Sequence, residues 1–142
     1  MSSAQTEVRA WMIAQIKADA GCQATALGAT PRVFNRVPNE GHPAFPAFPY
    51  LRIGSTSRPL ETDDKYGEEL TISLWVEGEA FGDLEGEAIF AATRALFRDA
   101  GPVVLSSHRL VNLEWVDDGV AAGEADKRYN GLQRWRAATE EN

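Results

Sequence analysis

Hydrophobic and polar positions alternate along the chain with two periods, one helical and one extended. Residues 3–20 carry apolar side chains at helical spacing, at Val8, Trp11, Met12, Ile13 and Ile16. Residues 83–99 repeat that spacing, and Asp83 and Gly101-Pro102 provide start and stop signals. On this second helix we expect the core-facing stripe to be Leu84, Ala88, Ala91, Ala92 and Ala95, flanked by Ile89, Leu96 and Phe97.

The remaining apolar positions follow the two-residue period of strands. The clearest case spans residues 68–77, where Leu70, Ile72, Leu74 and Val76 share one face. Further strands are expected at 32–37, 50–55, 109–117 and 127–137, and residues 103–107 are expected to form a brief strand or an extended lead-in. Within 109–117, the positions Val111, Leu113 and Trp115 alternate against polar neighbours. Polar segments 57–66 and 118–126 are expected to be loops, and residues 138–142 a disordered tail.

This order of elements predicts an α+β fold. We expect one mixed, mainly antiparallel sheet of about five strands with two helices packed on it. The chain has 142 residues, which is the usual size of one domain, and no composition shift marks a boundary. A single domain over residues 1–142 is therefore expected.

Composition and charge narrow the classes of function. The formal net charge is −7, whereas proteins that grip DNA usually present a basic face to the phosphates. The single cysteine, Cys22, excludes an internal disulfide and a multi-cysteine metal cluster. No stretch reaches the roughly 20 apolar residues that cross a bilayer, so we expect no membrane partner. Charged residues from Glu7 onward argue against a signal peptide.

Catalytic and cofactor motifs are missing from the sequence. It has no dinucleotide or phosphate-binding glycine loop, no paired-cysteine motif and no zinc-protease motif, so neither a cofactor nor a metal is expected. His42 and His108 are far apart, and ordinary surface positions are the favoured interpretation for both. Asp117-Asp118-Gly119 lacks the calcium-loop pattern and favours a hairpin loop. We therefore expect no catalytic residues.

Two charged groups allow several interpretations. The acidic residues Glu61, Asp63, Asp64, Glu68 and Glu69 favour a solvated loop, with a metal site or paired catalytic carboxylates as the alternatives. The last expected strand is basic, with Lys127, Arg128, Arg134 and Arg136. A charged solvent face or a subunit interface explains this strand better than a nucleic-acid stripe, because its aromatic residues lie on the opposite parity.

Short motifs in a fixed order give the most specific signal. They are Val33-Phe34-Asn35 followed by Pro38, then Pro49 to Gly54, then Ile72 to Trp75, between the two helices. In this order the chain resembles the tail-completion (tail-terminator) proteins of long-tailed phages and gene transfer agents. The resemblance covers about Val8 to Arg136. Two Ala-Phe-Pro repeats, Ala44–Pro46 and Ala47–Pro49, are unusual for that family.

The resemblance implies a structural protein of the virion or of a virus-like particle, assembled in the bacterial cytoplasm. Proteins of this family form a ring, usually a hexamer, at the head-proximal end of the tail tube. The ring ends tube growth and joins the tail to the head. Other neck proteins, such as a stopper or connector, are the nearest alternative, and a small cytoplasmic enzyme or binding module is a more distant one.

Expected partners are other copies of the chain, the tail tube protein, and a neck or head-completion protein. DNA would pass through the channel without tight binding. Three groups of residues are candidates for these contacts. The subunit interface would use Lys127, Arg128, Arg134 and Arg136. The tube-docking loop would use Ser57, Arg58, Glu61, Asp63, Asp64 and Lys65. The channel or rim carboxylates would be Glu61, Asp63, Asp64 and Glu124.

Overall fold

The computed structural model describes residues 3–60, 67–79, 83–123 and 128–142. Its helices are α1 (Ala4–Ala18), α2 (Ala20–Gln23) and α3 (Leu84–Phe97). Its strands are β1 (Val33–Phe34), β2 (Tyr50–Leu60), β3 (Gly67–Gly78), β4 (Val103–Val104), β5 (His108–Gly123) and β6 (Arg128–Glu141). None of the helices within these ranges is long and apolar enough to span a membrane.

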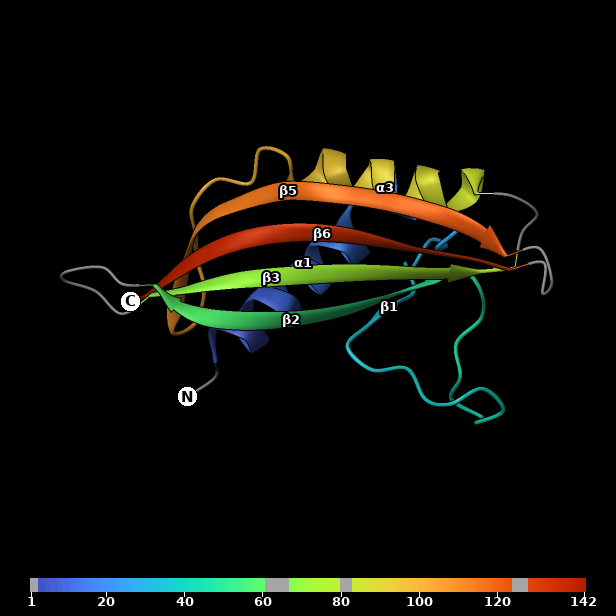
Figure 1. Cartoon of the computed structure of the whole chain (residues 1–142), viewed down its shortest axis with the longest axis horizontal. Coiled ribbons are helices and arrows are strands. Elements are labelled where there is room, and N and C mark those ends of the chain that lie inside the picture. Colours follow the sequence, from blue (N-terminus) through green and yellow to red (C-terminus); the bar gives the residue numbers. More distant parts are fainter. Residues whose placement is uncertain (1–2, 61–66, 80–82, 124–127) are drawn as a thin grey trace.

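The described strands form one six-stranded sheet in the order β1-β2-β3-β6-β5-β4. The short strand β1 pairs parallel with β2, and the other neighbours are antiparallel. Four long strands, β2, β3, β6 and β5, run the length of the molecule and curve together (Figure 1). The α+β class and the mixed, mainly antiparallel sheet are confirmed, with one more strand and one more short helix than expected.

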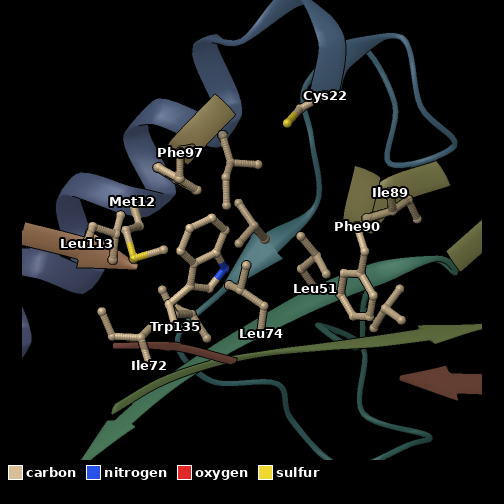
Figure 2. Packing of buried hydrophobic residues seen from close by; sticks show 14 of the residues in the cluster. Met12, Cys22, Leu51, Ile72, Leu74, Ile89, Phe90, Phe97, Leu113 and Trp135 are labelled. Carbon is tan, nitrogen blue, oxygen red and sulfur yellow. The ribbon is translucent and has the colours of Figure 1, made fainter. Parts of the chain in front are cut away.

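Both long helices cover the same face of the sheet, and the core lies between them and the strands. Leu70, Ile72, Leu74 and Val76 are fully buried, as the alternation in β3 predicts. From α1, Val8, Met12 and Ile16 are buried against them. Trp135 of β6 stands in the middle of this cluster, where its ring packs edge-on against Phe97 at a centroid distance of 5.7 Å (Figure 2).

Helix α1 ends earlier than the sequence indicates. Its start is capped by Ser3, whose hydroxyl accepts the backbone N–H of Thr6 at 3.1 Å. At Asp19 the backbone becomes extended, and the Asp19 carboxylate then accepts the N–H of Cys22 at 2.9 Å. Asp19 therefore ends α1 and caps α2, a second short helix that the sequence did not predict.

Helix α3 is rotated relative to the expected orientation. Ile89, Phe90, Thr93 and Phe97 are its buried side chains, whereas Leu84 is 76% exposed. Ala88, Ala91 and Ala95 are exposed as well. The expected alanine stripe was wrong because burying two phenylalanines removes far more apolar area from water than burying alanines does.

Three strands extend through segments expected to be loops or tail. Strand β2 includes residues 57–60, β5 includes 118–123, and β6 continues to Glu141. The expected disordered tail is wrong for residues 138–141, since Thr139 is buried and pairs with both β3 and β5. Hydrogen bonds between neighbouring backbones stabilise these polar stretches, and such bonds do not depend on a hydrophobic side-chain pattern.

Strand β5 carries two irregularities that change its alternation. Its register against β6 shifts between Leu110 and Asn112, and again between Trp115 and Asp117. Each shift leaves one extra residue, Val111 or Val116, in a β-bulge. The first bulge lets Leu110 and Leu113 both be buried while Val111 is exposed, and Trp115 is exposed although it has the parity of Leu113, so the simple alternation predicted for this segment was wrong.

Candidate functional site

The basic residues of β6 lie on the sheet face that the helices leave uncovered. Arg134 and Arg136 are exposed there, and their odd-numbered neighbours Gln133, Trp135 and Ala137 are buried, so the predicted parity is confirmed. Arg128 has the same parity, and Lys127 lies outside the described residues. Nothing in the arrangement tests their role as a subunit interface, which remains a prediction.

Each described arginine of this group is already paired within the chain. Arg134 donates to Asp117 on β5, which lies directly opposite in the register. The Arg136 guanidinium lies 3.5 Å from the Glu69 carboxylate on β3, and that carboxylate also pairs with Arg58 at 3.0 Å. The hydrogen bond from Arg134 holds the pKa of Asp117 below its usual range. A neighbouring subunit would therefore have to compete with internal acids for these cations.

Arg128 instead ties β6 to the proline-rich segment between β1 and β2. It donates to Glu40 at 2.6 Å and stacks over Phe48 at 5.0 Å. The hydrogen bond from Arg128 lowers the pKa of the Glu40 carboxyl. Phe48 also packs against Phe45 and Tyr50 at centroid distances of 5.6 Å. The segment is thus anchored to the sheet edge by one cation and one aromatic cluster.

The candidate docking loop and the candidate channel carboxylates are only partly within the described structure. Ser57 and Arg58 lie in β2, where the Ser57 hydroxyl accepts from Gln5 of α1 at 2.9 Å. The other members, Glu61, Asp63, Asp64, Lys65 and Glu124, lie outside the described residues. Of the wider acidic cluster, Glu68 and Glu69 belong to β3.

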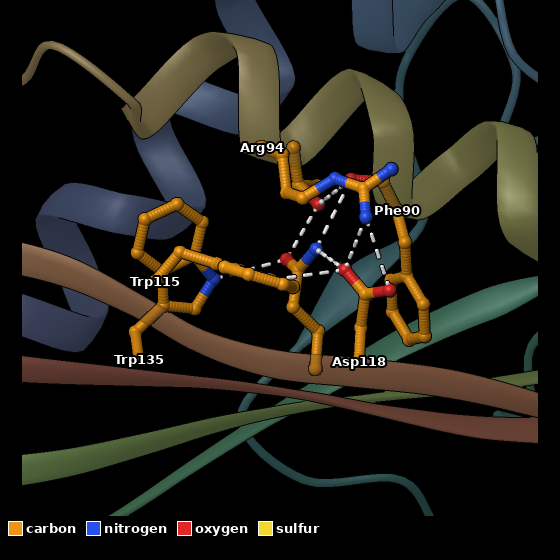
Figure 3. A network of polar contacts seen from close by, with 7 residues as sticks. Phe90, Arg94, Trp115, Asp118 and Trp135 are labelled. Atoms are coloured by element: carbon orange, nitrogen blue, oxygen red, sulfur yellow. Dashed lines mark hydrogen bonds and ion pairs between the residues drawn. The ribbon is translucent and has the colours of Figure 1, made fainter.

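A polar network that the sequence did not predict lies under α3. The Asp118 carboxylate accepts hydrogen bonds from Arg94 at 2.9 Å, from the Trp115 indole at 3.0 Å and from the Gln133 amide at 3.1 Å. The Gln133 carbonyl oxygen accepts in turn from Thr93 at 2.6 Å and Trp135 at 2.9 Å (Figure 3). Asp118 therefore lies in strand β5 and takes part in a hydrogen-bond network that joins β5 to α3 and β6. The hairpin-loop interpretation of Asp117–Gly119 was wrong.

Beside this network, a groove of about 630 Å³ opens between α3 and β5. We call it the α3–β5 groove, and its lining includes Ala91, Arg94, Arg98, Leu113, Trp115 and Trp135. Trp115 is 47% exposed although its indole N–H is held by Asp118. The groove thus combines an apolar wall with two arginines and, on the β5 side, Asn112 and Glu114, and this mixture suits contact with another protein surface.

His108 is buried, which corrects the expectation of a surface histidine. Its Nδ1 is paired with the carboxylate of Glu7 on α1, and that carboxylate also accepts the Ser107 backbone N–H. Burial raises the pKa of Glu7, but the hydrogen bonds from Ser107 and His108 outweigh it and hold this pKa below its ordinary value. The pair joins the start of α1 to the start of β5, so its position indicates a structural role.

The described residues contain no group of three or more His, Cys, Asp or Glu side chains that could hold a metal ion. Cys22 is buried, and burial together with the nearby Asp19 raises the pKa of its thiol to about 12. A thiol with this pKa is a poor nucleophile and a poor metal ligand at neutral pH.

The sequence contained a signal for the irregular pairing of β5. Val111 and Trp115 share the parity of Leu113, whereas the apolar Val116 has the opposite parity, and Val111 and Val116 are the residues that fall at bulges. An apolar excess on a strand with broken alternation indicates a bulge and an exposed contact surface. Arg94 and Gln133 could not be found as partners of Asp118 in this way, because they lie on α3 and β6.

Comparison with known proteins shows the family of this chain. The search of curated proteins gave no match. Among solved structures, a chain from "Virion of native gene transfer agent (GTA) particle" is similar at 26% identity and a TM-score of 0.75, over 98% of this chain and 99% of that one. The family model for "Tail completion protein gp17" matches residues 10–140. The resemblance seen in the sequence motifs is thus confirmed, together with a structural, non-enzymatic role in the tail region of a virion. The chain belongs to the gp17 family of tail completion proteins.

Proposed function

We propose that this protein forms a ring, in the common case a hexamer, at the head-proximal end of a phage-like tail tube. The ring ends tube growth and joins the tail to the head. The observation that carries the proposal is the likeness to a gene transfer agent virion chain over almost the full length of both chains. Such coverage leaves little of either chain without an equivalent in the other, which supports an equivalent structural role.

The partners in this proposal are further copies of the chain, the tube protein and a neck protein. A ring requires a heterologous contact, in which two different surfaces of the same molecule meet head to tail. The exposed arginines of β6, Arg134 and Arg136, are one candidate surface. Their internal pairs with Asp117 and Glu69 mean that a neighbour's acids would replace or share these bonds.

The hairpin that joins β2 to β3 is the proposed contact with the tube. Its two strands are paired along eleven register positions, from Tyr50 opposite Glu77 to Leu60 opposite Gly67, so they form a firm base for a connecting loop. Loops supported in this way commonly carry recognition. The proposed docking residues are Ser57, Arg58, Glu61, Asp63, Asp64 and Lys65.

DNA would pass through the ring without binding to it. The net charge of −7 repels phosphates, and Glu61, Asp63, Asp64 and Glu124 are the proposed channel or rim carboxylates. Substitutions that remove these carboxylates should slow the passage of DNA through the channel.

Electron microscopy of particles that lack this protein tests the proposal. If the ring ends the tube, such particles should have overlong tails, and their tails should be separate from heads. Tails of normal length that fail to join heads would instead indicate a stopper or connector acting later in assembly. Complete, normal particles would refute any role in tail completion.

A loop variant tests the contact with the tube. Residues 61–66 are replaced by Asn-Gly, a tight hairpin turn that keeps the β2–β3 pairing. The variant should fold, with an unchanged circular dichroism spectrum, but should fail to restore normal tails. The matched control keeps the loop length and replaces Pro59 alone with Ala. Normal tails from the Asn-Gly variant would eliminate the loop as the docking element.

Charge reversal tests the β6 surface. The Arg134→Glu/Arg136→Glu variant should fold and fail to assemble into rings. The control variant Asp117→Arg/Arg134→Glu exchanges the partners of one internal pair and so retains that pair. Rings of normal stability from the first variant would exclude the β6 arginines from the subunit contact.

A further inference from the structure

Exposed large hydrophobic side chains are concentrated in two places among the described residues. Val104, Val111, Trp115 and Val116 lie on β4 and β5, at the edge of the sheet. The fifth is Leu84, which is 76% exposed at the first residue of α3. Grouped apolar residues on a surface mark contacts with other proteins, whereas single ones are ordinary. Of the edge residues, Trp115 lines the α3–β5 groove, and Leu84 lies outside the groove at the start of α3.

The Trp115 side chain is fixed in position by contacts within its own chain. Its indole N–H donates to Asp118, and the Arg94 guanidinium lies 5.7 Å from the centre of its ring (Figure 3). Asp118 is itself fixed by Arg94 and Gln133. A half-exposed tryptophan that has already lost its rotamer freedom costs little further entropy on binding, which is typical of interface hot spots.

The charges beside the two apolar sites are complementary. Arg98 lines the α3–β5 groove, is exposed, and forms no ion pair with any described residue. Glu87 is exposed one turn after Leu84 and likewise has no described ion pair. Glu87 and Arg98 are 11 residues apart on one helix, about 16 Å along its axis, so they cannot pair within one copy.

We propose that the α3–β5 groove is the subunit contact of the ring and that a second copy of this chain occupies it. Leu84 of one copy enters the groove against Trp115 of the next, and Glu87 pairs with Arg98. The contact is head to tail because the inserting residues and the groove lie at opposite ends of α3. The inference rests on the proposed ring function, and it adds the contact surface.

A partner is expected to contact the side chains at the β5 edge and not to pair with its backbone as a further strand. The bulges at Val111 and Val116 interrupt the regular hydrogen-bonding pattern of β5. Bulged edge strands resist pairing with a further strand. The same bulges direct apolar side chains outward, which favours a contact through side chains. Compared with the β6 arginines, the groove also offers apolar area and a cation, Arg98, that forms no ion pair within the described part of the chain.

Charge exchange tests the pairing of Glu87 with Arg98. Glu87→Arg and Arg98→Glu should each weaken self-association about tenfold, measured by sedimentation velocity over a concentration series. The double variant Glu87→Arg/Arg98→Glu restores opposite charges across the contact and should recover most of the loss. Arg36→Glu is the control, since Arg36 is exposed in the segment after β1. Single variants that associate like the unaltered protein would overturn the proposed pairing.

Cysteine cross-linking traps the contact even where free association is weak. In the Leu84→Cys/Ala91→Cys variant the two thiols are seven residues apart on α3, about 10 Å, which is too far for a bond within one copy. Mild oxidation should give a ladder from dimer to closed ring, whereas either single variant should stay monomeric. A ladder that stops at the dimer would indicate a two-fold contact, and no cross-link would exclude the groove; both results overturn the proposal.

The proposed ring function and the proposed contact surface can be tested independently of each other. Tail length in particles that lack the protein reports on tail termination and does not depend on which surface joins the subunits. Cross-linking and charge exchange report only on the α3–β5 groove. Overlong tails without the protein, together with no groove cross-link, would leave the proposed function standing and remove this contact.

Discussion

Single residues control how closely the strands and helices approach one another, and Gly78 is the clearest case. A Cβ atom at this position would lie 2.1 Å from the ring of Tyr129, far inside the closest normal contact. Tyr129 is fully buried and donates its hydroxyl to Glu85 of α3 at 2.6 Å. The missing side chain of Gly78 therefore allows Tyr129 to connect the end of β3 to the start of α3.

Gly78→Ala should destabilise the fold by about 1 to 3 kcal/mol, because Tyr129 must move and its bond to Glu85 must break. Urea unfolding measures the change. Gly101→Ala is the matched control: no atom lies within 4 Å of its added Cβ, so its stability should be unchanged or slightly higher. Equal effects of the two substitutions would show that Tyr129 does not constrain Gly78.

The buried pair of Glu7 and His108 should make the fold sensitive to acid. Hydrogen bonds from Ser107 and His108 keep the pKa of Glu7 below its value in the unfolded chain. A lowered folded pKa gives stability that is present above the unfolded pKa and is lost as the pH falls through the folded one. The free energy of unfolding should therefore decrease as the pH falls through the ordinary carboxyl range and toward the folded pKa.

Glu7→Gln removes this titration and tests its contribution. The variant should lose about 1 to 3 kcal/mol at pH 7, where the charged hydrogen bonds are complete. Its stability should then fall less steeply than that of the unaltered protein between pH 5 and pH 3 (roughly the carboxyl range). Parallel pH profiles for the two proteins would mean that Glu7 titrates alike in the folded and unfolded chains.

At the scale of elements, α3 shows which of two apolar faces of a helix becomes buried. Its sequence offers an alanine stripe and an aromatic stripe, and both have helical spacing. The structure buries Phe90 and Phe97 and turns Leu84 and Ala91 outward. Because the two faces compete for one core, the face with the larger apolar area is buried. The outward stripe then becomes available to a partner.

Phe97→Ala and Leu84→Ala form a matched test of this orientation. Phe97 is 1% exposed and packs on Trp11 and Trp135, so its loss should cost about 3 to 5 kcal/mol. Leu84→Ala should change stability by less than about 0.5 kcal/mol. Thermal or urea unfolding measures both values. A large loss for Leu84 alone would place the alanine stripe in the core.

At the scale of the whole molecule, net charge determines the behaviour toward DNA. The chain carries −7, and its described surface arginines at positions 58, 128, 134 and 136 are paired with internal acids. These pairs reduce the positive charge that is available to displace counterions from phosphates. We therefore expect no saturable binding of double-stranded DNA by the isolated protein at physiological salt, measured by fluorescence anisotropy. Micromolar or tighter binding would contradict passive passage of DNA.

The sequence by itself determined the parts of the fold that repeat locally. The buried face of β3 follows from strict alternation, because every second side chain of a strand points the same way. The parity of Arg134 and Arg136 follows for the same reason, since β6 contains no register shift. The family, too, was recognisable from short motifs in a fixed order, and the match over residues 10–140 confirms it.

Only the tertiary structure decided which of several possible patterns is used. The buried face of α3 depends on what fills the core, and the bulges of β5 depend on its pairing with β6. The polar ends of β2, β5 and β6 are strands because neighbouring backbones bond to them, which no side-chain pattern records. Two partners of Asp118, Arg94 on α3 and Gln133 on β6, are distant from it in the chain, and only Trp115 is a neighbour on β5. Contacts of this kind form through folding, so the α3–β5 groove emerges only in three dimensions.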